Sequence, residues 1–423
     1  MQLLLKQVKI VDPTSSYHQQ VKDILIKNGK IEAIRNSISN NVKTYKLAGA
    51  CVSPGWMDVG ALVGDPGYEH IETLGTLSQA AARGGFTTVA VLPNTQPALH
   101  SKSEIDYIHR NSQALITSIL PMGSLTMSCD GQHMSEMIDL HRAGAIAFTD
   151  GKRSVQDAGV LLRALEYVRS FDGIIVNQPQ LRGVSPDGLM HEGEVSVSLG
   201  LPGLPDLMEV LMVKRDIDLT RYSGSRLHLL NISSAESLPV IAAAKAEGLS
   251  ISCSVPALNL VATDEQLTGF DPNYKVMPPL RSEQTRQRLI EAVRSGLIDF
   301  IVSNHRPVDI EAKMVEFAYA DFGISSLETT YGTVCRALGP NRSQSQIVQR
   351  LAINNRRIFN LQVPTIERGR DAEMTLFDPD SSTLYDKKDF ASRSKNNPYL
   401  GKELPGKVLG VINKDKAQFQ PTG

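Results

Sequence analysis

The chain has 423 residues, which is long enough for one large α/β domain with a smaller appendage, or for two or three average domains. Lys and Arg number 44 against 45 Asp and Glu, so no net charge draws the chain to nucleic acid or to an anionic membrane, and neither is expected as a partner. The cysteines form no CxxC pair, and no apolar run approaches the roughly 18 residues that span a bilayer, so we expect a cytoplasmic protein with reduced thiols.

The two ends of the chain show the alternation of apolar and polar side chains that is typical of strands. The first 50 residues contain LLLKQVKIVD and KDILIKNGKIEAIR, in which Asn28-Gly29 predicts a tight hairpin turn. After residue 360, RGRDAEMTLFDPD and GKVLGVINKD return to the same alternation. We therefore predict that residues 1–53 and 361–423 together build one small β-sandwich-like domain.

The central part of the chain, residues 54–360, consists of short apolar runs separated by helical stretches. This pattern is typical of repeated βα units around a parallel sheet. The apolar runs are residues 56–62, 86–93, 114–120, 145–150, 173–178, 226–231, 250–255 and 299–304. Eight such runs predict an α/β fold with a closed (β/α)₈ TIM-type barrel.

The functional side chains of such a barrel lie at the C-terminal ends of its strands. Most of these positions carry neutral side chains here. The strand-end positions, neutral and ionisable together, are Gly60, Leu62, Asn94, Asp150, Asn177, Asn231, Asn304 and His305. Amide oxygens are weak ligands for zinc, which prefers imidazole, thiolate and carboxylate groups. Only Asp150 and His305 could therefore contribute to a divalent metal site.

Six motifs give the chain a resemblance to a known family. They are SPGWMDVGALVGDPG, VLPNTQP, AGAIAFTDG, NYKVMPPLRS, IDFIVSNHRP and SRSKNNPYLGKELPGKV. In order and spacing they resemble the motifs of the dihydroorotases, cyclic amidohydrolases of the bacterial class with a long barrel and a flanking β domain. The resemblance covers nearly the whole chain. It implies an amidohydrolase-like barrel and a place in pyrimidine biosynthesis.

The same resemblance implies that most of the metal ligands are missing and that Asp150, the acid ending strand four, is the one usual ligand left. In the family, histidines on strand one, histidines ending strands five and six, and an aspartate ending strand eight hold the metal. The corresponding positions are Gly60, Leu62, Asn177, Asn231 and Asn304. Hydrolysis of a cyclic amide needs hydroxide made from metal-bound water, whose pKa the cation lowers toward ~7. We therefore expect no metal cofactor, where active members use zinc, and no hydrolysis.

The substrate contacts that the resemblance implies are also largely missing. The arginine that grips the substrate carboxylate corresponds to Gly64, and the asparagine before the double proline corresponds to Met277. Asn94 alone keeps a recognised substrate-binding position. If the protein is active through an atypical site, Asp150 and His305 are the residues left to carry the catalysis.

Three functional hypotheses follow. The first is a dihydroorotase-like protein that has lost its metal site and serves a structural or regulatory role; the resemblance implies aspartate carbamoyltransferase as a candidate partner, and a homo-oligomer. The second is an active dihydroorotase or another cyclic amidohydrolase with an atypical site. The third is a small-molecule binding module in the vacated pocket, with four amide donors. These are Asn94, Asn177, Asn231 and Asn304.

Two local expectations concern charged side chains near the strand ends. We predict that Arg306 turns into the old metal site and pairs with Asp150, supplying the positive charge of the missing cation. The alternative is that Arg306 points into solvent while water or Lys152 satisfies Asp150. We also interpret residues 188–196, with one histidine and two glutamates, as a solvated loop rather than a replacement metal cluster.

Overall fold

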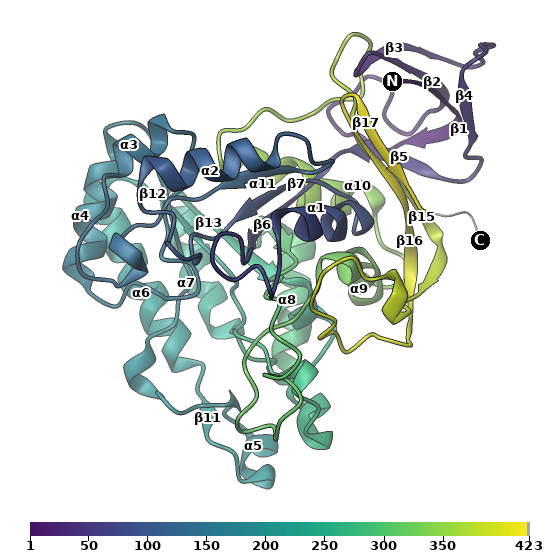
Figure 1. Ribbon diagram of the computed structural model, residues 1–423. Coiled ribbons are helices and arrows are strands. Elements are labelled where there is room, and N and C mark those ends of the chain that lie inside the picture. The colour runs from purple at the N-terminus through teal and green to yellow at the C-terminus, as the bar shows by residue number, and fades with distance from the viewer. Residues whose placement is uncertain (421–423) are drawn as a thin grey trace.

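A small sheet at one end of the molecule contains strands from both ends of the chain. The computed structural model describes residues 1–420, and it places this sheet beside the larger domain (Figure 1). The strands of the sheet run in the order β17-β16-β15-β5-β1-β2-β3, with β4 paired to β1. Their bounds are β1 Gln2–Ile10, β2 Val21–Lys27, β3 Lys30–Arg35, β4 Lys43–Lys46, β5 Cys51–Pro54, β15 Glu373–Leu384, β16 Glu403–Asn413 and β17 Lys416–Phe419.

The turn between β2 and β3 and the pairing of β5 with β15 fix the shape of this sheet. Asn28 and Gly29 have φ values of 49° and 73°, so the predicted hairpin turn is confirmed, because a tight turn of this kind needs two positive φ values. Strand β15 runs antiparallel to β5, with Thr375 opposite Ser53. The last part of the chain is thereby hydrogen-bonded to the segment that leads into the larger domain.

The larger domain is the predicted (β/α)₈ barrel. Seven of its strands are β6 Trp56–Ala61, β7 Phe86–Val91, β8 Ser118–Pro121, β9 Ile174–Asn177, β12 Arg226–Leu229, β13 Ile251–Pro256 and β14 Phe300–Val302. The eighth position is the run 145–150, where Phe148 bridges Gly123 on one side and Ile175 on the other. The ring closes where Leu62 N donates to His305 O at 2.9 Å. The fold class predicted from the sequence is confirmed.

Helices alternate with these strands and cover the barrel. They are α1 Leu74–Arg83, α2 Lys102–Ser112, α3 Met137–Arg142, α4 Ala158–Arg169, α6 Leu207–Ser223, α7 Leu238–Ala246, α8 Glu283–Ser295, α9 Thr330–Leu338, α10 Gln344–Val348 and α11 Asn354–Ile358. The hydroxyl of Ser282 caps the start of α8 by accepting from Thr285 N, and Gly296, at φ 89°, ends it. Within residues 1–420, no helix is both long and apolar enough to cross a membrane.

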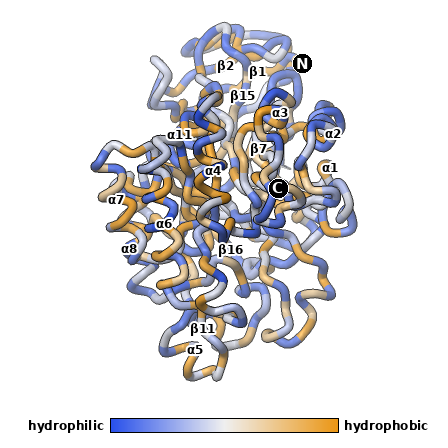
Figure 2. The backbone as a smooth tube through the Cα atoms, turned by 90° about the vertical axis from the view of Figure 1, so that its left-hand side faces the viewer, coloured by the Kyte–Doolittle hydropathy of each residue, from blue (hydrophilic) through white to orange (hydrophobic). Residues whose placement is uncertain are grey.

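A long excursion leaves the barrel between β9 and α6. It contains β10 Met190–His191, α5 Glu194–Leu199 and β11 Gly203–Leu204, and it lies at the end of the molecule opposite the small sheet (Figures 1 and 2). The interpretation of this segment as a solvated loop is wrong for His191, which is buried. Its Nδ1 accepts a hydrogen bond from Arg281 at 3.0 Å, so the imidazole joins the excursion to the barrel.

Candidate functional site

A cavity of about 500 Å³ lies at the barrel mouth, on the side where the strands end. Segments that follow four different strands supply Leu62, Lys152, Gln180 and Arg306 to its wall, and Met277 lies among them. Of the strand-end positions singled out in the sequence, Leu62 is the one that lines this cavity within the described part of the chain. The asparagines are therefore engaged elsewhere.

The space beside Gly60 on the first strand is tight. A Cβ atom added to Gly60 would lie 3.0 Å from Cδ2 of Leu230, and the backbone of Gly60 has φ +90°. A buried leucine from the end of β12 thus occupies the volume next to this position. Leu62, two residues further on, presents an apolar surface to the cavity.

Gly64 sits where the family resemblance places the arginine that grips the substrate. A Cβ atom added there would run into the carbonyl oxygen of Tyr68 and would lie 2.7 Å from the carbonyl oxygen of Glu72. Real Cβ atoms do not approach backbone oxygens this closely, so the loop 64–72 has no room for any side chain at this position. The loop is built around a glycine.

This close approach leads to a stability prediction for Gly64→Ala. The added methyl group must displace backbone, and we expect the free energy of unfolding to fall by about 1–3 kcal/mol in urea denaturation. Gly75→Ala in α1 is the matched control, because its Cβ would meet only Thr73 Oγ1, at 3.7 Å. A helical Gly→Ala change should be neutral or stabilise by up to about 1 kcal/mol. Equal effects at the two positions would contradict the crowding at Gly64.

Asp58 of the first-strand motif joins strand one to strand eight. Its carboxylate accepts hydrogen bonds from Ser303 N at 2.7 Å and from Ser303 Oγ at 2.5 Å. Burial raises the pKa of Asp58 to about 6, against the lowering effect of the Ser303 hydrogen bonds. The group therefore has a structural role, because it joins strand one to strand eight where the barrel closes.

The raised pKa of Asp58 predicts a pH-dependent contribution to stability. A carboxyl with a folded-state pKa above its unfolded value takes up a proton on folding, so its contribution is present below about pH 4 and is lost as the pH rises through about 6. Asp58→Asn removes this titration. We expect the difference in free energy of unfolding between the native protein and Asp58→Asn to fall by about 2 kcal/mol between about pH 4 and pH 7.5. A difference that does not change with pH would contradict the assignment.

The asparagines that end strands five, six and eight are bonded within the protein. Asn177 Nδ2 donates to Asp216 Oδ2 of α6 at 2.7 Å. Asn231 Nδ2 donates to Asn304 Oδ1 at 3.0 Å, and Asn304 Nδ2 donates to Met277 O at 3.2 Å. Asn231 and Asn304 have φ values of 63° and 53°, a left-handed conformation that asparagine adopts more readily than most residues. These amides are not free donors, contrary to the binding-module hypothesis.

Asp150 and Asn94 form a second local network. The carboxylate of Asp150 accepts from Thr126 N at 2.8 Å and from Thr126 Oγ1 at 2.5 Å, and burial raises its pKa to about 6. Asn94 bonds the backbone on both sides, donating to Asp150 O at 3.0 Å and accepting from Lys152 N at 2.9 Å. Both side chains thus fix the loop that follows the fourth barrel strand.

The predicted ion pair between Arg306 and Asp150 is wrong. Thr126 satisfies the carboxylate of Asp150, while the Arg306 guanidinium donates to Gln178 Oε1. The solvent-exposed alternative is wrong as well, because Arg306 is only 5% exposed. The physical reason is that both carboxylate oxygens of Asp150 already accept a hydrogen bond, one from Thr126 N and one from Thr126 Oγ1. Burial also raises the pKa of Asp150, which disfavours the charged form that would attract a cation.

His305 forms a buried pair with Glu72, a residue that the sequence reasoning missed. Its Nε2 lies 3.3 Å from Glu72 Oε2, and its Nδ1 accepts from Ser326 N at 3.1 Å. Although burial acts to raise the pKa of Glu72, the hydrogen bond and charge of His305 and the hydroxyls of Ser392 and Thr76 lower it. Both side chains are fully buried, so the pair is part of the protein interior.

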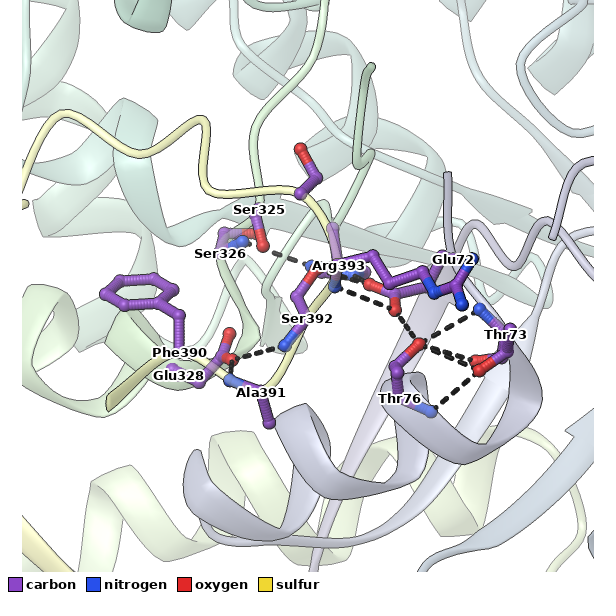
Figure 3. A network of polar contacts seen from close by, with 12 residues as sticks. Glu72, Thr73, Thr76, Ser325, Ser326, Glu328, Phe390, Ala391, Ser392 and Arg393 are labelled. Atoms are coloured by element: carbon purple, nitrogen blue, oxygen red, sulfur yellow. Dashed lines mark hydrogen bonds and ion pairs between the residues drawn. The ribbon is translucent and has the colours of Figure 1, made fainter. Parts of the chain in front are cut away.

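Glu72 and Glu328 hold the C-terminal segment 390–394 against the barrel (Figure 3). Glu72 accepts from the hydroxyls of Thr76 and Ser392, and Glu328 Oε1 accepts from Ala391 N at 2.9 Å and Ser392 N at 3.1 Å. No motif marked either glutamate in the sequence, because their partners lie far away along the chain. The segment is therefore hydrogen-bonded both to the loop that follows β6 and to the turn that precedes α9.

The donors at the strand ends do not fit a zinc ion. Within residues 1–420, no group of three or more His, Cys, Asp or Glu side chains is arranged to hold a metal. One buried acceptor at these strand ends, Asn231 Oδ1, lacks a hydrogen-bond partner among the described residues, and a single amide oxygen is a weak ligand. Asp150 and His305, the two groups left for an atypical site, are engaged with Thr126 and Glu72.

Comparison with known proteins defines first the class of fold and then the family. An L-hydantoinase (dihydropyrimidinase) from Arthrobacter aurescens superimposes with a TM-score of 0.85 at 22% identity, over 98% of this chain and 95% of that one. The dihydropyrimidinase from Brevibacillus agri NCHU1002 gives a TM-score of 0.82 at 19% identity, over 99% and 96% of the two chains. At these identities the likeness defines the fold, a barrel with a flanking β domain.

Sequence comparison supplies the family. Residues 49–237 match the Dihydro-orotase-like family model. The chain is 36% identical to a dihydroorotase of Syntrophus aciditrophicus, over 99% of this chain and 100% of that protein. It is also 36% identical to a dihydroorotase of Pelotomaculum thermopropionicum, over 97% of both. The chain belongs to the dihydroorotase family.

Proposed function

We propose that this protein is a non-catalytic member of the dihydroorotase family, which binds no catalytic metal and acts as a structural or regulatory partner in pyrimidine biosynthesis. One observation carries the proposal. The asparagines at two former ligand positions bond to each other, Asn231 Nδ2 to Asn304 Oδ1 at 3.0 Å, and the second also bonds the backbone at Met277. Polar contacts within the protein take the place of a donor set for a cation.

The repacked first strand supports the same proposal. Leu230 fills the space beside Gly60, and the loop that contains Gly64 has no room for an arginine. Restoring one ligand or one substrate contact would therefore require the backbone and the core to move together. An active dihydroorotase with an atypical site has less support, because Asp150 and His305 are both occupied by internal partners.

We further propose a protein partner, either aspartate carbamoyltransferase or a second copy of this chain. The segment 310–319 supports a protein contact, because four large apolar side chains are exposed within ten residues. They are Ile310, Met314, Val315 and Tyr319. This segment lies next to the barrel mouth, since Ala312 lines the cavity.

Complementation and co-purification test the two parts of the proposal. In a bacterial strain without its own dihydroorotase, the protein should not restore growth without added pyrimidine, whereas the Syntrophus relative should. Growth would contradict the loss of catalysis. Co-expressed with the aspartate carbamoyltransferase of its own source, the tagged protein should co-elute with it, or elute as a dimer or larger in its absence. Elution of both proteins as free monomers would contradict the partner role.

A further inference from the structure

Arg306 places a positive charge at the wall of the barrel-mouth cavity without a carboxylate to balance it. The side chain is 5% exposed, and within residues 1–420 the guanidinium donates its hydrogen bond to Gln178 Oε1, a neutral acceptor. Its Nε is buried and has no hydrogen-bond partner among the described residues. Burial lowers the pKa of Arg306 to about 10, with no acidic neighbour acting in the opposite direction. An arginine remains charged under these conditions, so the charge needs a partner.

The rest of the cavity wall is partly basic and partly apolar. Lys152 and Arg182 line it, and the charges of Arg306 and Arg153 add to desolvation in lowering the pKa of Lys152. Two carboxylates also line the cavity. Asp309 is engaged with Glu311 N at 2.9 Å, and Asp321 acts to raise the pKa of Lys152. Neither of them pairs with the guanidinium of Arg306.

We propose that the barrel-mouth cavity binds a small organic anion whose carboxylate or phosphate group sits on the Arg306 guanidinium. The planar guanidinium, which lines the cavity and has no carboxylate partner among the described residues, can donate two parallel hydrogen bonds to either group. Leu62, Met277 and Phe322 provide apolar contacts for the body of the molecule. A volume of about 500 Å³ is within the range of small-molecule sites.

This site does not depend on the loss of hydrolysis. The family resemblance places the substrate-gripping arginine at Gly64, which has no room for a side chain, so Arg306 supplies a different anion contact from a different strand end. Lys152, at the outer part of the cavity, adds a second positive charge to the same ligand. The remaining question is which anionic group fits.

Isothermal titration at constant ionic strength tests the site, with succinate, inorganic phosphate and the neutral succinamide as probes. We expect saturable binding of succinate or phosphate and none of succinamide; the stronger of the two anions identifies the group that the site prefers. Arg306→Gln should weaken binding by about tenfold or more, and Arg306→Lys should weaken it less. Arg163→Gln, at an exposed position on α4, should leave binding unchanged.

Folding of each variant is checked by circular dichroism and urea denaturation. If Arg306→Gln does not fold, Lys152→Gln keeps the test valid, because this side chain is exposed and its loss should still weaken binding by about threefold. Binding of neither anion would overturn the proposal. Equal affinity in Arg306→Gln and the native protein, or an equal loss in Arg163→Gln, would overturn it as well.

Discussion

Purified protein, supplied with zinc, is expected to hydrolyse dihydroorotate or form it by cyclisation no faster than buffer alone. The reason is chemical: without a cation there is no hydroxide at neutral pH to attack the ring amide, and the amides of Asn231 and Asn304 cannot replace it. Enzymes typically accelerate their reactions by at least about 10⁶-fold, so the expected deficit is large and easily measured by absorbance.

The Syntrophus aciditrophicus dihydroorotase, expressed and assayed in parallel, is the positive control. Turnover above background by this protein would contradict the expectation, and its loss on treatment with a chelator would show that a bound metal is responsible. Turnover that a chelator left intact, but that Asp150→Asn or His305→Gln abolished, would instead establish the atypical site that those two residues would form.

His305→Leu is expected to cause the largest loss of stability. The substitution leaves the buried Glu72 without the hydrogen bond from His305 Nε2. Leaving a buried polar group without a partner typically costs about 1–3 kcal/mol, and more for a charged group such as a carboxylate. The lost acceptor at Nδ1 also leaves Ser326 N unpaired. Urea denaturation near pH 7 measures the effect directly.

His133→Leu is the matched control, because this histidine is exposed and its replacement should change the free energy of unfolding by less than about 0.5 kcal/mol. Glu72→Gln keeps a hydrogen-bonding group beside His305 and should cost less than His305→Leu. A loss for His305→Leu no larger than that for His133→Leu would show that the pair with Glu72 contributes nothing to folding.

The sequence was sufficient to predict the barrel, because its strands are short and apolar and alternate with helices, some of which end at a left-handed glycine such as Gly224 or Gly296. The run 145–150 is the weakest of the eight: Phe148 makes ladder bonds to both neighbours without forming a regular strand. Asn28-Gly29 predicted its turn correctly because local backbone conformation alone decides it. Such features depend on few residues, close together in the chain.

The side-chain partners at the barrel mouth could not be predicted in the same way. The choice of Thr126 by Asp150, and of Gln178 by Arg306, depends on which strand ends face each other across the barrel. The prediction that Arg306 pairs with Asp150 rested only on their opposite charges. It failed because a buried carboxyl with two good donors has little need of a cation. The hydroxyl of Ser392 donates to the carboxylate of Glu72, although the two residues lie 320 positions apart in the sequence. No local sequence pattern marks such a contact.

Zinc stoichiometry measures directly whether this protein holds a catalytic metal. The protein is expressed in zinc-supplemented medium, purified without chelator, dialysed against zinc and analysed for metal, with the Syntrophus relative treated identically. We expect well under one zinc ion per chain for this protein, because no group of three or more ligating side chains is present within residues 1–420. One or more tightly held zinc ions per chain, retained through dialysis and lost on treatment with a chelator, would contradict it.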